Sequence, residues 1–132
     1  MSHENVELVH RLAEAWNRSD VEAVLALFDS ECEVVFPPEV PEPGPFYGHE
    51  ELRRWAEGFL AAWEFHHSEV REIVEAGESV VAVLHLVGRG IGSGVEMDET
   101  NAHLFTIRQG RIVRWQNFNE RADALQAAGL RE

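Results

Sequence analysis

One histidine stands in the middle of a strand-like run of apolar residues. The run is Val80 to Val87, and His85 is its only titratable side chain. An imidazole with a pKa near 6.5 can accept a proton at neutral pH, so a histidine facing a pocket is a candidate general base. Burying the ring without a hydrogen bond would cost about 1–3 kcal/mol. A histidine that is hydrogen-bonded within the core, with no chemical role, is the competing interpretation.

Other reactive residue types lack the partners that their chemistry needs. The run Gly88-Arg89-Gly90-Ile91-Gly92 has no P-loop lysine and no helix after it, so we do not expect it to hold phosphate. His66 and His67 are adjacent and point to opposite faces of a strand, and the histidines show no metal-ligand spacing. Cys32 is the only cysteine and has no basic neighbour to activate it. We therefore expect neither a metal site nor a cofactor.

The composition is that of a folded, strongly acidic chain of 132 residues. Hydrophobic residues make up 45%, which is enough for a core, and no run nears the 18 apolar residues of a membrane span. The 24 acids and 11 bases give a net charge of −13, which disfavours nucleic acid and anionic membranes as partners. A polar N-terminus and a single cysteine favour a cytoplasmic protein. The length predicts one domain, residues 1–132.

Apolar spacing predicts four helices. Val6 to Trp16 carries an apolar stripe with helical period. Ser19 and Glu22 then have the spacing of a capping box, which predicts a second helix directly afterwards. Gly48 to Trp63 shows the clearest helical period, and Arg121 to Ala128 is a short terminal helix.

Five segments are predicted to be strands, from period-two alternation or, in the third, from an almost wholly apolar run that would be covered on both faces. They are Cys32 to Phe36, Phe65 to Glu75, Val80 to Val87, Val95 to Arg108 and Arg111 to Phe118. Hairpin turns join the last four, which predicts an antiparallel meander with the early helices covering one face, an α+β fold. All five prolines lie between Pro37 and Pro45, which predicts an ordered loop, either a stiff connector or a lid.

Three stretches carry a resemblance to a known family. They are Val6 to Asp20 with Ala26-Leu27-Phe28, Phe46 to Leu52, and His103 to Trp115 with Arg121 to Leu125. They resemble the SnoaL-like, ketosteroid-isomerase-like branch of the nuclear transport factor 2-like superfamily. The resemblance implies a cystatin-like α+β barrel, in which a cone-shaped, curved antiparallel sheet wraps around three N-terminal helices and a short helix ends the chain. This fold serves isomerases, cyclases, hydrolases and non-enzymes, so it does not define an activity.

The resemblance also implies which catalytic groups are missing. Ketosteroid isomerases place a tyrosine where Leu12 stands, a carboxylate base where Phe36 stands and an aspartate where Ala102 stands. We therefore expect no ketosteroid isomerase activity. The last-strand aspartate of SnoaL-type cyclases and of limonene epoxide hydrolases matches Asn117, and an amide cannot act as a general base.

The family register predicts which side chains face the apolar pocket. On the sheet these are Val83, His85, Val87, Ala102, Leu104, Trp115, Asn117 and Asn119. On the helical side Trp16, Phe36, Trp55, Phe59 and Trp63 close the cavity. If the protein is an enzyme, we expect His85 to be the general base and Asn117 to be its partner or an amide donor to the substrate. The alternative is that the aromatic side chains simply fill the core.

Two function classes remain open. The first is an isomerase, cyclase or lyase that acts on an apolar small molecule through the pocket histidine. The second is a ligand-binding or dimerisation module without chemistry. The same register places Val95, Met97, Phe105 and Ile107 with His103 on the convex face, so we expect an exposed apolar patch there and a homodimer through it.

Overall fold

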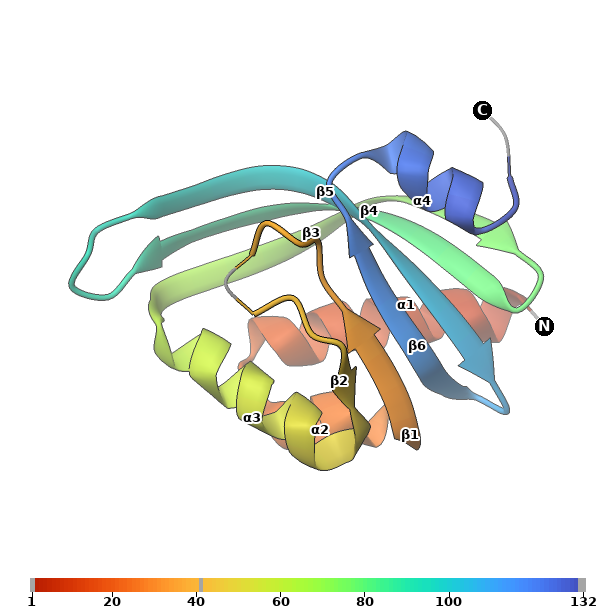
Figure 1. Ribbon diagram of the computed structural model, residues 1–132, viewed down its shortest axis with the longest axis horizontal. Helices are drawn as coiled ribbons and strands as arrows, with labels where there is room; N and C mark the ends of the chain where they lie inside the picture. Colours follow the sequence, from red (N-terminus) through yellow and green to blue (C-terminus); the bar gives the residue numbers. More distant parts are fainter. Residues whose placement is uncertain (1, 41, 131–132) are drawn as a thin grey trace.

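A curved six-stranded sheet organises the protein (Figure 1). The computed structural model describes residues 2–40 and 42–130. In chain order the elements are α1 (Ser2–Asn17), α2 (Val21–Ala26), β1 (Phe28–Val35), β2 (Phe46–Tyr47), α3 (Gly48–Ala61), β3 (Trp63–Ala76), β4 (Ser79–Gly90), β5 (Glu96–Arg108), β6 (Arg111–Phe118) and α4 (Arg121–Ala127). The sheet order is β2-β1-β6-β5-β4-β3, so the predicted α+β class is confirmed.

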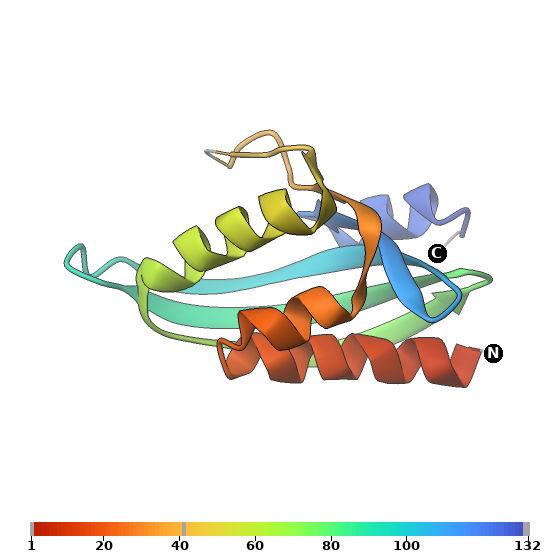
Figure 2. The same cartoon turned by 90° about the horizontal axis from the view of Figure 1, so that it is seen from below.

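The strands β3 to β6 form the predicted antiparallel meander, and β1 extends it on the far side of β6. The pairing of β1 with β6 is parallel and sets Val34 beside Trp115, a feature that the sequence did not predict. The helices α1, α2 and α3 lie beneath the curve of the sheet, whereas α4 lies on the other side (Figures 1 and 2). The sheet therefore has an inner face toward three helices and an outer face that α4 partly covers.

The turn between α1 and α2 differs from the predicted capping box. Asp20, and not Ser19, caps α2, because its carboxylate accepts a hydrogen bond of 3.1 Å from the backbone N–H of Ala23. Ser19 has a φ of 57°, and its backbone N–H donates to the carbonyl of Trp16 at 2.9 Å. Glu22 forms an ion pair with Arg53 of α3 instead of reaching back to Ser19. Ser19 thus occupies a left-handed turn, which leaves its hydroxyl free for another partner.

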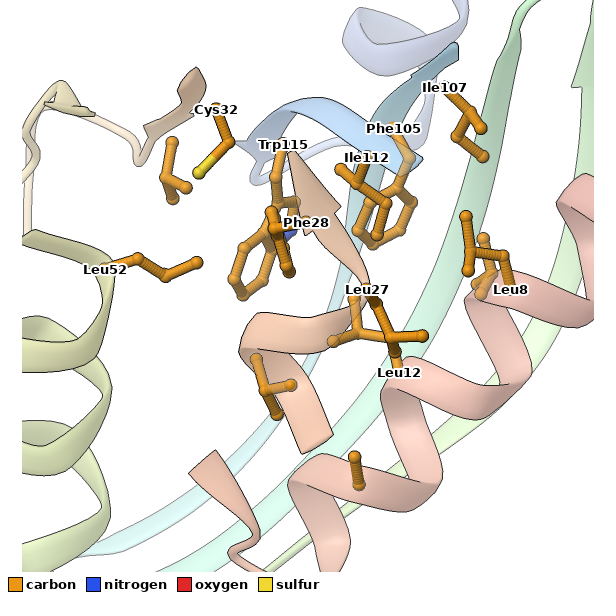
Figure 3. Packing of buried hydrophobic residues seen from close by; sticks show 14 of the residues in the cluster. Leu8, Leu12, Leu27, Phe28, Cys32, Leu52, Phe105, Ile107, Ile112 and Trp115 are labelled. Atoms are coloured by element: carbon orange, nitrogen blue, oxygen red, sulfur yellow. The ribbon is translucent and has the colours of Figure 1, made fainter. Parts of the chain in front are cut away.

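The inner core joins the helices to β1, β5 and β6. Phe28 and Trp115 lie at its centre with ring centroids 5.9 Å apart, and Phe105 stacks on Trp115 at 5.9 Å (Figure 3). Leu12 of α1 and Leu52 of α3 close the core from the helical side. Each such apolar side chain contributes about 1.5–3 kcal/mol by leaving water, so this cluster holds the helices against the sheet.

A second, smaller core lies on the outer face under α4. Ala124 and Leu125 of the helix pack there against the sheet. The sheet residues in this cluster are Val81, Val83, Ala102 and Leu104, with Val74 and Phe118 beside them. These side chains therefore point away from the three N-terminal helices.

The proline-rich segment is an ordered loop between β1 and β2. The backbone N–H of Phe36 donates to the carbonyl of Pro43 at 2.9 Å, and the amide of Asn119 donates to Glu39 at 3.3 Å. Residue 41 of this predicted loop lies outside the described residues. Within the described part of the chain, no helix has the length and apolar character to cross a membrane.

Candidate functional site

A cavity of about 890 Å³ lies between the inner face of the sheet, α1, α3 and the proline-rich loop. Seven aromatic residues line it: Trp16, Phe36, Trp55, Phe59, Trp63, Phe105 and Trp115. Trp55 is the centre of a stack, with Trp16 at 5.6 Å, Phe36 at 4.5 Å and Phe59 at 5.4 Å between ring centroids. Trp55 and Phe59 share one side of α3 because they are four residues apart.

One end of this cavity contains a buried histidine in a chain of hydrogen bonds. The indole N–H of Trp115 donates to Nδ1 of His103 at 2.9 Å. Because Nδ1 accepts, Nε2 carries the proton and donates to Oδ1 of Asn101 at 2.8 Å. Complete burial lowers the pKa of His103 to about 3, so the ring is neutral at pH 7. Both ring nitrogens are engaged, and His103 has no free lone pair with which to act as a base.

Next to His103 the amide of Asn117 is incompletely bonded. Asn117 pairs with His103 across β5 and β6, lines the cavity and is only 8% exposed. Its Nδ2 is buried and has no hydrogen-bond partner among the described residues. A buried donor without a partner costs about 1–3 kcal/mol, which an acceptor brought by a ligand would offset.

The edge strand β3 presents a second histidine. His66 of β3 lines the cavity, and its Nε2 lies 2.9 Å from the hydroxyl oxygen of Ser19. Its Nδ1 is buried without a partner in the described part of the structure. Desolvation, and secondarily the neighbouring His67, lower the pKa of His66. The ring of His66 is therefore mainly neutral at pH 7.

The ionisable groups of the cavity lining are mostly acidic. Glu42, Glu96 and Glu99 line the cavity, and Arg54 is the only arginine among the described lining residues. The field of a chain with a net charge of −13 has the same sign. This electrostatic environment favours neutral or cationic molecules over anions.

Most of the predicted pocket residues lie at this cavity. All five on the helical side, namely Trp16, Phe36, Trp55, Phe59 and Trp63, line it, as do Trp115, Asn117 and Asn119 on β6 and the residue that follows it. Asn101, His103 and His66 also line it and were not predicted to do so. The cavity lining does not include Val83, His85, Val87, Ala102 or Leu104.

The predicted orientation of β4 and β5 is wrong by one residue. Leu84 and Leu86 face the cavity on β4, and Leu84 pairs with Asn101 of β5. The neighbouring residues Val83 and Ala102 pair with each other and contact α4 on the outer face. Side chains alternate along a strand, so one misplaced residue reverses every position on it.

His85 lies on the outer face in a surface network. The guanidinium of Arg71 donates to its Nδ1 at 3.0 Å, and its Nε2 donates to Asp98 at 2.7 Å. Arg71 also pairs with Glu69 at 2.8 Å. These partners satisfy both ring nitrogens. Because His85 lies on the outer face and Asn117 lines the cavity on the inner face, the two side chains cannot share a ligand.

The predicted convex apolar patch is also absent from the described residues. Phe105 and Ile107 are buried in the inner core. Val95 and Met97 line the cavity, so these side chains belong to the inner face. The patch residues were assigned to the wrong face for the same reason as His85, because the same predicted register placed both.

Among the described residues, no three His, Cys, Asp or Glu side chains gather in a way that would hold a metal ion.

The curved sheet around three helices has the same fold as a solved nuclear transport factor 2-like protein. A sequence model of the SnoaL-like domain matches residues 9–115, so the chain belongs to the SnoaL-like domain family. No curated protein matches the chain by sequence.

Three solved structures illustrate the similarity of fold. A nuclear transport factor 2-like protein of unknown function from Burkholderia pseudomallei is 20% identical, with a TM-score of 0.80 over 93% of this chain and 95% of that chain. A protein with a ketosteroid isomerase-like fold from Catenulispora acidiphila, in complex with trimethylamine, is 22% identical, with a TM-score of 0.77 over 94% and 93%. TerC, co-crystallised with polyporic acid, is 18% identical, with a TM-score of 0.78 over 96% and 98%.

Proposed function

We propose that this chain binds a largely apolar, ring-containing small molecule with an oxygen that accepts a hydrogen bond, such as a ketone. The observation that carries the proposal is the unpartnered amide nitrogen of Asn117 in the wall of an aromatic cavity. A volume of about 890 Å³ lies within the range of small-molecule sites, roughly 300–1,000 Å³. Two proteins of the same fold were crystallised with small molecules, trimethylamine and polyporic acid, which supports a similar use here.

The polar groups of this wall are neutral hydrogen-bonding groups. The bond from His103 engages Oδ1 of Asn101, which leaves the NH₂ group of Asn101 to face other partners. Asn117 of β6 pairs with His103, which is two residues from Asn101 on β5. Two amide donors in an apolar cavity suit a carbonyl oxygen, because they bind it without a buried charge.

The positions of the histidines favour binding over catalysis by His85 or His103. An isomerase, cyclase or lyase needs a group that accepts a proton from the substrate. His85 lies on the outer face, and His103 has both ring nitrogens engaged. Neither histidine is therefore assigned a catalytic role in this proposal.

A matched ligand pair tests the role of Asn117. Benzophenone and diphenylmethane have the same two rings and differ in the ketone oxygen. Isothermal titration calorimetry should show that the wild type binds benzophenone about tenfold more tightly, the effect of roughly 1.4 kcal/mol from one hydrogen bond. The Asn117→Leu variant should bind both compounds equally, whereas Asn119→Leu should keep the preference, because Asn119 already donates to Glu39. Equal binding of the two compounds by the wild type, or no binding of either, would overturn the proposal.

A further inference from the structure

Two buried side-chain polar atoms in the described part of the chain have no hydrogen-bond partner. They are Nδ2 of Asn117 and Nδ1 of His66. Both belong to residues that line the same cavity, although they come from β6 and β3. Buried polar groups are almost always bonded in native proteins, so two exceptions at one cavity point to a missing partner for each.

The two atoms belong to strands that are far apart in the same sheet. β6 and β3 are not neighbours in the sheet, since β5 and β4 lie between them. His66 is packed beside the end of α1, where its ring meets the edge of Trp16 at 6.2 Å between centroids. One small polar group cannot satisfy both atoms, so the missing partner of His66 is a different part of the ligand.

The position of the His66 ring is fixed by the chain around it. Ser19 holds Nε2 from the left-handed turn after α1. The side chain of Asn17 makes two hydrogen bonds with the backbone of Ser68, at 2.9 and 2.8 Å, and so ties the end of α1 to β3. The Ser19 hydroxyl is therefore held against one ring nitrogen while the other is left without a partner.

Resting on the proposed function, we propose that His66 recognises a hydroxyl group of the ligand through Nδ1, so that the ligand is two-ended, with an accepting oxygen at Asn117 and a hydroxyl at His66. A hydroxyl suits this site because it can donate or accept. If the imidazole Nε2–H donates to Ser19, Nδ1 accepts from the hydroxyl, and if Ser19 donates, Nδ1–H donates to it. Both atoms are shielded from solvent, so neighbouring side chains must move to expose them to the ligand, a change that is common on binding.

A neutral hydroxyl fits the surroundings better than a charged group. Desolvation and His67 lower the pKa of His66, so the ring carries no positive charge at pH 7 to attract a carboxylate or phosphate. The glutamates that line the cavity disfavour anions further. The ligand class is thus a hydroxylated, ring-containing ketone.

Four compounds that share one skeleton separate the two ends. Diphenylmethane carries neither group, benzophenone carries the ketone, 4-benzylphenol carries the hydroxyl and 4-hydroxybenzophenone carries both. Calorimetry at pH 7 should show that the hydroxyl strengthens wild-type binding about fivefold, the size expected of one hydrogen bond, with or without the ketone. The His66→Phe variant, which keeps a ring against Trp16, should lose this hydroxyl preference and keep the ketone preference. The control variant His85→Phe changes a histidine on the outer face, outside the cavity lining, and should keep both preferences. Asn117→Leu should lose only the ketone preference.

Nitrogen NMR of the wild type tests the same contact without any substitution. The Nδ1 resonance of His66 should shift with 4-hydroxybenzophenone and stay unchanged with benzophenone. A wild type that prefers the ketone but not the hydroxyl would overturn this inference alone. A hydroxyl preference that survives in His66→Phe would do the same. If no compound binds, or if the ketone preference is absent, the proposed function fails as well.

Discussion

His103 should make the stability of the fold depend on pH in a measurable way. Its pKa is about 3 in the folded protein because the ring is completely buried, against about 6.5 in the unfolded chain. Well above pH 6.5 neither state binds the proton, and this contribution to stability is complete. As the pH falls from 6.5 toward 3 the unfolded state takes up a proton that the folded state cannot hold. Each pH unit in this window therefore costs up to about 1.4 kcal/mol, or about 2 kcal/mol in total between pH 7.5 and pH 5.0.

Urea unfolding at these two pH values measures the effect. The variant His103→Gln removes the titrating group and keeps an amide that can accept from Trp115 and donate to Asn101. The surface carboxylates titrate alike in both proteins and cancel in the comparison. The wild type should lose about 2 kcal/mol more than the variant between pH 7.5 and pH 5.0. Equal losses in the two proteins would refute the burial argument for His103.

Three further predictions concern other parts of the molecule. Asn17→Ala removes both hydrogen bonds to the Ser68 backbone and should lower the free energy of unfolding by about 2 kcal/mol. A denaturant titration measures this, and a change below about 0.5 kcal/mol would show that the contact is not stabilising. His85→Leu should leave benzophenone affinity unchanged within about twofold in the calorimetric assay, because the ring bonds Asp98 on the outer face, and a tenfold loss would contradict that placement. A homodimer stays a prediction without an assigned surface, and light scattering at micromolar concentration that gives the 15.0 kDa monomer would contradict it.

The order of elements could be read from the sequence, whereas the orientation of the central strands could not. The helices and the meander follow from periodicity, and their observed bounds differ from the predicted ones by only a few residues in most elements. β4 is apolar on both faces, since Val81 and Val83 meet α4 while Ala82 and Leu84 meet the inner core. A strand buried on both sides has no alternation from which to infer its inner face.

Local irregularities also hide the register. The pairing of β3 with β4 shifts between Val70 and Glu72, and that of β5 with β6 shifts between Thr106 and Ile107. Each irregularity changes the alternation on one strand but not on its neighbour. A correct count along the chain can therefore still assign the wrong face.

The sequence pattern of β5 contains enough information to place two residues of the candidate site on the inner face. Asn101 and His103 alternate with Phe105 on β5, and all three face the cavity. Phe105 pairs with Trp115 across the strands, so the correct placement of Trp115 would have brought His103 to the inner face. His66 offered no such signal, because its significance depends on the left-handed turn at Ser19 and on an unsatisfied atom.

The parallel pairing of β1 with β6 has a consequence for biosynthesis. During translation α1, α2 and β1 leave the ribosome long before β6, yet Phe28 needs Ile112 and Trp115 as its neighbours. Closing so long a stretch of chain is entropically costly and slows folding. The apolar side chains of β1, such as Phe28 and Val34, lack these neighbours until the last strand has been made. The N-terminal half is thus the part of this protein expected to rely on chaperones while its synthesis is incomplete.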